Sequence, residues 1–234
     1  AEIIIEGEIC PDYKVEEGPF GEYTGYRTSP RDFRVTFRVN CITYRNNATM
    51  TISNMGVPQD EGQLLRSFSL GLELEKLLKS QGIPITGVYM HPRSTHHMMI
   101  VGVKPTYSGI ASQIAQLAFG SKLGPWFHMV VVVDDKTDIY NWNEVYHALC
   151  TRCHPANGIH IYKNTTGTPL YPFATPHERK HSIGSKVLFD CLWPLEWDPV
   201  NEVPTTVSFK SVYSQEIQDR VTSNWTAYGY PPVK

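Results

Sequence analysis

The sequence contains no run of about 18 consecutive apolar residues, the length that a helix needs to cross a bilayer. It also has no excess of charge of one sign, because 21 Lys and Arg stand against 23 Asp and Glu. Proteins that bind nucleic acid through their surface normally carry a concentrated positive charge. We therefore expect no membrane span and no nucleic-acid interface.

Cysteine is scarce and odd in number, with five cysteines in 234 residues. The stretch at residues 2–6 lacks the basic, apolar and small-residue regions of a secretory signal. An odd number of cysteines without such a signal is typical of reduced thiols. We therefore expect a cytoplasmic protein, and its length is sufficient to bury a sizeable core.

Residues 1–55 have the alternating pattern of β-structure. Apolar and polar side chains alternate over residues 33–41, which predicts a half-buried antiparallel strand, and a further strand is expected over residues 2–9. Residues 45–47 supply turn chemistry, so we expect a hairpin that leads from residues 33–41 into residues 48–53. The segment resembles the closing strands of a sheet or barrel whose other strands are missing.

From Gln59 the spacing of apolar residues becomes helical. It predicts a helix that ends at Gln81, with Gly82 in the C′ position. A second helix is expected after Ser108, whose hydroxyl can serve as the N-cap, and a third from about Asn141.

Strands alternate with these helices. They are expected over residues 83–90, 97–103, 128–133, 159–162 and 186–191, and the third is apolar enough to be buried on both faces. The alternation predicts that residues 56–205 form an α/β domain with a mixed sheet. The tail, residues 206–234, carries a helix near residues 214–225 and several aromatic residues, which we expect to dock on this domain or on a neighbouring subunit.

An acidic, glycine-rich stretch at residues 17–26 carries the first candidate for chemistry. Two glycines and a proline predict a bend between Glu17 and Glu22. In a straight strand, the odd spacing would place the two carboxylates on opposite faces, so only a bend can bring them toward one cavity. The alternative is a solvated turn, which is where carboxylates usually lie.

Two other patterns suggest metal or haem sites. Residues 150–154 match the C-x-x-C-H pattern of covalent haem attachment, typical of a c-type electron carrier, although ordinary packing at a helix end explains them as well. His91, His96 and His97 suggest zinc, but no nearby cysteine or acid completes a tetrahedral shell.

Lys122 lies in a glycine-flanked turn between an expected helix and an expected buried strand. A lysine in this position can reach a phosphate or a ring oxygen of a ligand at the sheet edge. The alternative is an ordinary surface lysine. The charged run at residues 177–181 is expected to be a solvated loop.

Six blocks occur in a fixed order along the chain. They are Glu17-Gly-Pro-Phe-Gly-Glu22-x-x-Gly-Tyr26, Asn40-Cys-Ile-Thr-Tyr-Arg-Asn-Asn-Ala48, Val132-Val-Asp-Asp135, Thr151-Arg-Cys-His-Pro155, Gly167-Thr-Pro-Leu170 and Gly184-Ser-Lys186. Together they resemble the UbiD-type decarboxylases, and most of all the ferulic/cinnamic acid branch. The resemblance implies reversible, non-oxidative decarboxylation of aromatic or α,β-unsaturated acids with prenylated FMN, a divalent metal (usually manganese) and potassium.

The resemblance also implies roles for individual residues. Glu22 would deliver the proton to the carbon that loses CO2, Glu17 would hold a catalytic arginine, and Lys122 would contact the cofactor. The arginine, the metal ligands and most phosphate contacts of the family lie upstream of the position of Ala1. We therefore expect the C-terminal half of such an enzyme, inactive alone and paired with the N-terminal half on the same or a separate chain, in a homodimer or larger oligomer.

The expected fold is α+β: residues 1–55 close a split flavin-binding β-barrel, and an α/β domain and a helical tail follow. By resemblance, Tyr23, Thr168, Pro169 and Leu170 line the substrate. Arg66 stands where the cinnamate-like branch is aliphatic, and an inward arginine would pair with a polar or anionic group. This favours a hydroxylated, heteroaromatic or dicarboxylic aromatic acid. The alternatives are a solvent-facing Arg66 and, for the whole chain, a non-catalytic scaffold subunit.

Overall fold

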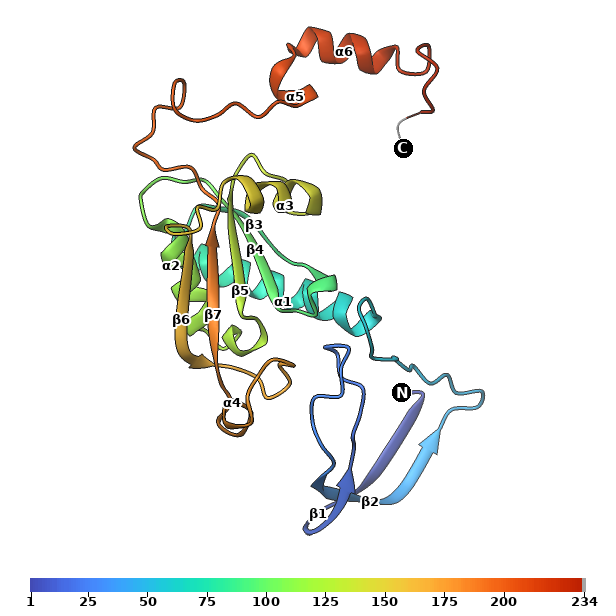
Figure 1. The fold of residues 1–234 in the computed structure, drawn as a ribbon. Helices are drawn as coiled ribbons and strands as arrows, with labels where there is room; N and C mark the ends of the chain where they lie inside the picture. Colours follow the sequence, from blue (N-terminus) through green and yellow to red (C-terminus); the bar gives the residue numbers. More distant parts are fainter. Residues whose placement is uncertain (233–234) are drawn as a thin grey trace. The chain divides into compact units, whose positions relative to one another are not determined.

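The computed structural model describes residues 1–232. The chain forms two compact units, Ala1–Leu192 and Trp193–Lys234. The first unit contains a long two-stranded hairpin and an α/β domain, and Figure 1 shows both. None of the helices in the described part of the chain is long and apolar enough to span a membrane.

The hairpin consists of β1 (Ile3–Glu17) and β2 (Asp32–Tyr44), paired antiparallel as expected for β2. The pairing register shifts between Cys10 and Lys14, so the chain bulges there and Pro11 needs no partner in the ladder.

The expected strand over residues 48–53 is wrong. These residues have no regular structure, and β2 pairs with β1 instead. Beyond the turn, the backbone N–H of Thr49 donates to the Glu2 carboxylate over 3.1 Å, and the backbone N–H of Arg45 donates to the Glu2 carbonyl over 2.9 Å. These bonds hold the chain to the start of β1, so it does not run back along β2.

The expected burial of the hairpin is also not met. Phe33 is 59% exposed and Phe37 is 48% exposed, although both lie on the apolar face of β2. Ile4 and Ile9 of β1 are exposed as well. The reason is that a two-stranded sheet has no second layer of its own, and the rest of the described chain does not cover it.

The α/β domain is built on a five-stranded mixed sheet. Its strand order is β3-β4-β5-β7-β6, with parallel pairing for β4-β5 and β5-β7 and antiparallel pairing at both edges. The strands are β3 (Ile85–Met90), β4 (Met98–Val103), β5 (Met129–Asp134), β6 (Ile159–Thr166) and β7 (Ile183–Asp190). The mixed sheet is confirmed, and the central strand β5 is buried on both faces, with Val130–Val133 fully inaccessible.

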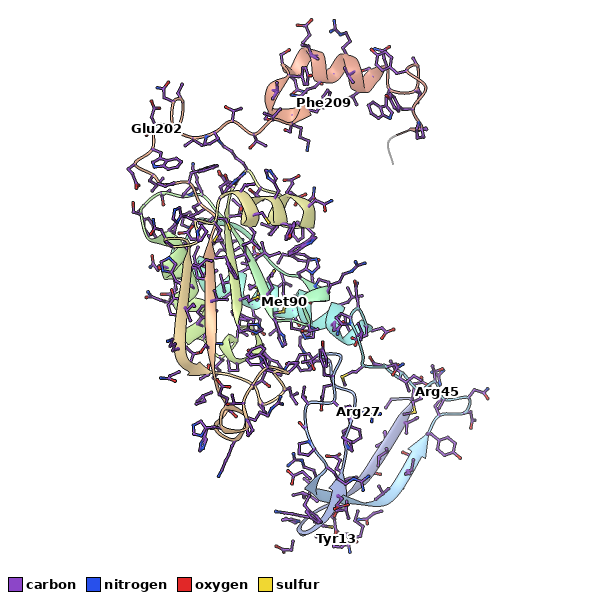
Figure 2. The ribbon with its side chains drawn as sticks, in the orientation of Figure 1. Tyr13, Arg27, Arg45, Met90, Glu202 and Phe209 are labelled. Carbon is purple, nitrogen blue, oxygen red and sulfur yellow. The ribbon has the colours of Figure 1, made fainter. Side chains whose placement is uncertain are left out.

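Helices cover both faces of this sheet (Figure 1). On one face, α1 (Glu61–Ser80) and α2 (Ile110–Gly120) bury a cluster that includes Leu74, Leu78 and Ile114. On the other face, α3 (Trp142–Thr151) packs Val145 and Ala148 against Ile100, Val131 and Val133. Met90 of β3, labelled in Figure 2, is fully buried in this domain.

Helix ends agree with the sequence in part. Helix α1 ends with Gln81 as C-cap and Gly82 at a φ of +75°, as expected. Ser108 is not the cap of α2, because Gly109 occupies the N-cap position at a φ of +82° without any side-chain bond. The positive φ excludes most other residues, so the chain enters α2 through backbone geometry.

The charged run at residues 177–181 forms a helix rather than the expected loop, and Glu178 and Arg179 are half-buried in it. Helix α4 (Pro176–His181) begins with a capping box, in which Thr175 Oγ1 accepts from the Glu178 backbone and Glu178 accepts from the Thr175 backbone. This reciprocal pair satisfies donors that a loop would leave to water.

The first unit also contains two short 3-10 helices, η1 (Pro92–Ser94) and η2 (Gly124–Trp126). In the second unit the helices are α5 (Phe209–Val212) and α6 (Gln215–Ser223). Within this unit, Trp225 stacks on Tyr230 with ring centroids 4.5 Å apart. The docking of these aromatic residues elsewhere stays a prediction.

Candidate active site

The bend expected at residues 17–26 is present. Gly18 and Gly25 have φ values of +87° and +81°. The Glu22 N–H donates to the Tyr26 carbonyl over 3.0 Å, and the Gly25 N–H donates to the Glu22 carbonyl over 2.9 Å, which closes a tight turn. A Cβ at Gly25 would lie 3.1 Å from the Cα of Val57. Glycine at position 25 therefore permits the bend to contact the segment around Val57, which has no regular secondary structure.

The bend places its two acids in different surroundings. The Glu17 carboxylate is exposed and lies 4.0 Å from the Arg34 Nε. Glu22 is half-buried and adjoins the buried Tyr23. Within this chain the two carboxylates do not share one enclosed cavity, so their joint role stays a prediction.

Tyr23 is 6% exposed and is held by the first turn of α1. The Gln63 side-chain amide donates to the Tyr23 carbonyl over 2.8 Å, and the Gln63 carbonyl accepts from His96 Nε2 over 3.1 Å. Gln63 also completes the capping box of α1 with Asp60. A single side chain therefore ties the bend to the start of α1.

Arg66 lies over two aromatic rings. Its guanidinium carbon is 5.5 Å from the centroid of Tyr23 and 4.7 Å from that of Trp126. Burial raises the pKa of the Tyr23 phenol, and the nearby Arg66 charge and Thr168 hydroxyl offset part of that rise. The structure thus brings Tyr23, Arg66 and Thr168 together, one residue from Glu22.

Trp126 is a site residue that the sequence reasoning missed. It lies in the 3-10 helix η2, which directly follows the turn that contains Lys122. Its contact with Arg66 joins segments 60 positions apart, and no local pattern reports such a contact.

The other expected substrate residues lie on the loop after β6. Thr168 and Leu170 are half-buried and Pro169 is exposed. Arg179 holds this loop, because its guanidinium donates to the carbonyls of Pro169, Pro172 and Ala174 over 2.8–3.0 Å.

Arg179 also links the loop to the acidic bend. A further bond of 2.8 Å runs from its Nη1 to the carbonyl of Thr28. The sequence pattern predicts for Arg179 only a place in a charged, solvated run. Its role as a cross-link depends on a contact 151 residues away, which the local pattern does not indicate.

Lys122 is exposed and lines a hollow of about 650 Å³ that none of Tyr23, Arg66 and Thr168 lines. The hollow also contains hydroxyl groups, including those of Ser121 and Thr166. A cation beside hydroxyl groups suits an anion such as a phosphate in charge and hydrogen bonding. The residues present therefore fit the phosphate end of a flavin nucleotide.

Lys186 is a second lysine of note, since it is 2% exposed. Its ammonium donates to the carbonyls of Gly124 and Phe127, the latter over 2.9 Å. Burial lowers its pKa to about 8. The side chain fixes the turn that carries Trp126, and it is a structural member of the last sequence block.

The metal and haem alternatives gain no support. Among residues 1–232, no group of three His, Cys, Asp or Glu side chains could hold a metal ion. His154 Nδ1 accepts from the backbone N–H groups of Ala156 and Asn157, so this imidazole caps the turn after α3. The five cysteines are free.

Two family models match the chain. Residues 1–58 match the 3-octaprenyl-4-hydroxybenzoate carboxy-lyase Rift-related domain. Residues 63–191 match the 3-octaprenyl-4-hydroxybenzoate carboxy-lyase C-terminal domain. The first match covers the hairpin and most of the link to α1, and the second begins within the first turn of α1.

Individual proteins show the same similarity. Ferulic acid decarboxylase 1 of Saccharomyces cerevisiae is 28% identical over 98% of this chain and 48% of its own length. Vanillic acid decarboxylase of Sedimentibacter hydroxybenzoicus, solved in a closed form, superposes with a TM-score of 0.79 at 27% identity, over 96% of this chain and 46% of that one. The UbiD-class enzyme HmfF of Pelotomaculum thermopropionicum, solved with FMN, gives 0.74 at 26% identity, over 89% and 45%. The chain therefore spans about half the length of the relatives it matches.

Proposed function

The chain belongs to the UbiD family of carboxy-lyases, and we propose that it supplies the C-terminal half of an enzyme that decarboxylates an aromatic or α,β-unsaturated acid. The relatives named above are decarboxylases of ferulic and vanillic acids. The observation that carries the proposal is the cluster of Tyr23, Arg66 and Thr168 beside Glu22. It combines an anion-binding group, an aromatic wall and a half-buried acid.

In this proposal, the chain's own groups bind the substrate and move one proton. Glu22 donates the proton to the carbon that has lost CO2, because it is the acid next to the aromatic cluster. Glu17 orients an arginine from the N-terminal half, in place of its present exposed contact with Arg34. Prenylated FMN, when bound, supplies the electron sink for decarboxylation.

Arg66 defines the substrate class in this proposal. Its guanidinium can pair with a second polar or anionic group while the ring of the substrate lies against Tyr23 and Trp126. Thr168, Pro169 and Leu170 form the opposite wall. This favours hydroxylated, heteroaromatic or dicarboxylic aromatic acids over plain cinnamate.

The uncovered apolar side chains of the hairpin support the proposal that an N-terminal half packs against it. Large apolar side chains of β1 and β2 are exposed on both faces, and an isolated two-stranded sheet of this kind is only marginally stable. We propose that the N-terminal half covers it and completes a split flavin-binding barrel, with Lys122 toward the cofactor phosphate. The ligands for Mn²⁺ and K⁺ then belong to that half, and the assembled enzyme forms a homodimer or larger oligomer in the cytoplasm.

The test is to combine this chain with the N-terminal half and prenylated FMN, and to measure CO2 release from a panel of aromatic acids. The proposal expects release from hydroxylated, heteroaromatic or dicarboxylic acids, and none from this chain alone. Flavin binding without release from any acid in the panel would contradict it. The alternative, a non-catalytic scaffold, predicts that loss of the Glu22 carboxyl leaves CO2 release by its partner unchanged.

A further inference from the structure

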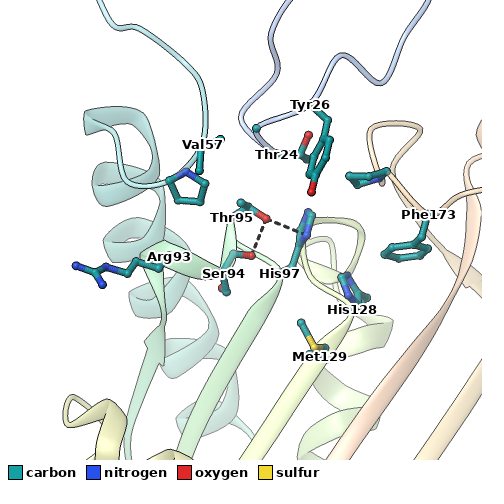
Figure 3. A pocket seen from close by; sticks show the side chains of 13 residues that line it. Thr24, Tyr26, Val57, Arg93, Ser94, Thr95, His97, His128, Met129 and Phe173 are labelled. Carbon is teal, nitrogen blue, oxygen red and sulfur yellow. Dashed lines mark hydrogen bonds between the residues drawn. The ribbon is translucent and has the colours of Figure 1, made fainter.

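A cavity of about 570 Å³ lies beside the bend, separate from the cluster around Arg66. Figure 3 shows its lining, with Thr24, Tyr26 and Val57 on one side and His97, His128 and Phe173 on the other. Neither Arg66 nor Thr168 lines it. Its size falls in the range of small-molecule sites.

Three polar atoms at this cavity are buried without a partner. They are Thr24 Oγ1, His97 Nε2 and His128 Nδ1. Thr24 is 4% exposed and His97 is 6% exposed. Because buried polar atoms in folded proteins are nearly always hydrogen-bonded, three unpaired atoms around one cavity point to a bound polar molecule.

The tautomer of His97 follows from its neighbour. The Thr95 hydroxyl donates its single hydrogen to the Ser94 carbonyl over 2.6 Å. It can therefore only accept from His97 Nδ1, which lies 3.0 Å away, so Nδ1 carries the hydrogen (Figure 3). Burial lowers the pKa of His97 to about 3, which keeps the ring neutral at pH 7. His97 Nε2 is consequently an acceptor and needs a donor from the ligand.

The walls of the cavity favour a flat, uncharged ring. Phe173 lies against His128 with ring centroids 5.0 Å apart and stacks on Tyr171 at 5.1 Å. Val57, Pro58, Met129 and Pro172 add apolar surface. The one permanent charge in the lining belongs to Arg93, which is exposed. The buried Lys186 ammonium, whose charge acts on His128, does not line the cavity and donates to the carbonyls of Gly124 and Phe127.

We propose that this cavity binds a neutral hydroxyaromatic molecule of the phenol class, whose hydroxyl donates to His97 Nε2 and whose ring lies against Phe173 and the apolar side chains of the lining. A carboxylate cannot replace this hydroxyl, because it carries no hydrogen to donate. The inference goes beyond the proposed decarboxylation, because none of the cavity residues is assigned to that reaction. Binding at this cavity can therefore be tested without the flavin or the N-terminal half.

The experiment is calorimetric titration of the 234-residue chain with phenol, with anisole and with 4-hydroxybenzoate. Anisole keeps the ring and loses the donor, whereas 4-hydroxybenzoate keeps the donor and adds a charge. Phenol is expected to bind, and each of the other two about tenfold more weakly. Equal affinity for phenol and anisole, or no binding of phenol, would overturn the proposal.

Variants locate the site. His97→Phe removes the acceptor and is expected to weaken phenol binding about tenfold. His181→Phe, at an exposed histidine of α4, is the matched control and keeps the affinity. Where His97→Phe alters the circular dichroism spectrum, Thr24→Val serves instead, with an expected loss of about fivefold. Unchanged affinity in the variant used would show that phenol binds elsewhere and would overturn the assignment.

Discussion

The guanidinium carbon of Arg66 lies 4.7 Å from the ring centroid of Trp126 and 5.5 Å from that of Tyr23. Such cation–π contacts each contribute about 0.5–1 kcal/mol at partly exposed positions. The arrangement fixes a positive charge beside the residue that follows Glu22. The edge of a guanidinium group can pair with a planar anion such as a carboxylate.

Arg66→Ile tests this arrangement in the assembled enzyme. The variant is expected to raise KM at least about tenfold for acids with a second polar or anionic group, because a charge-assisted hydrogen bond is lost. The KM for plain cinnamate should change much less. Steady-state kinetics on both substrates, with the exposed Arg93→Ile as the matched control, measure the difference. Full activity of Arg66→Ile on the polar acids would remove the support for this substrate class.

Arg179→Met tests the link between the loop after β6 and the bend. Arg179 donates to the carbonyls of Thr28, Pro169, Pro172 and Ala174. Losing these bonds is expected to lower the free energy of unfolding by about 1–3 kcal/mol, because partly buried carbonyls lose a charged donor. Urea unfolding measures the change.

The neighbouring Lys180→Met is the control for that substitution. Lys180 is exposed on the same helix, so its replacement should change the free energy of unfolding by less than about 0.5 kcal/mol. Equal effects of the two substitutions would show that the Arg179 bonds add nothing specific.

The buried histidines predict a pH dependence of stability. Burial lowers the pKa of His97 from its ordinary 6.5 to about 3, and that of His128 to about 4. Between pH 6.5 and these values the unfolded chain binds more protons than the folded one, so the free energy of unfolding falls as the pH falls. The slope is at most about 1.4 kcal/mol per pH unit for each histidine.

Urea unfolding at pH 7, 6 and 5 measures that slope. His97→Gln should flatten the dependence, whereas the exposed His181→Gln should leave it unchanged. A His97→Gln variant with the slope of the original chain would contradict the assignment of the proton uptake to His97.

Local patterns in the sequence predict much of the α/β domain. The continuous apolar run of β5 correctly predicts burial on both faces, and Gly82 correctly marks the end of α1. These features depend on neighbouring residues, so the pattern and the structure share one cause. The expected N-cap of α2 is wrong, since Gly109 rather than Ser108 occupies that position.

The errors and omissions concern tertiary contacts. Alternation over residues 33–41 predicts a buried face, but burial requires a covering layer that the described residues do not supply. Trp126 beside Arg66 and Arg179 beside Thr28 depend on how distant segments meet. The roles of Glu17, Glu22 and Lys122 come from the resemblance and remain predictions.

The most direct measurement of the central claim is CO2 release by the assembled enzyme carrying Glu22→Gln, compared with Glu73→Gln, an exposed glutamate of α1. Flavin absorbance confirms that each assembly holds its cofactor. The account predicts that Glu22→Gln lowers kcat at least about 100-fold, because the proton donor is lost, while Glu73→Gln keeps it. Equal kcat values for the two variants would contradict the assignment of Glu22 as the proton donor.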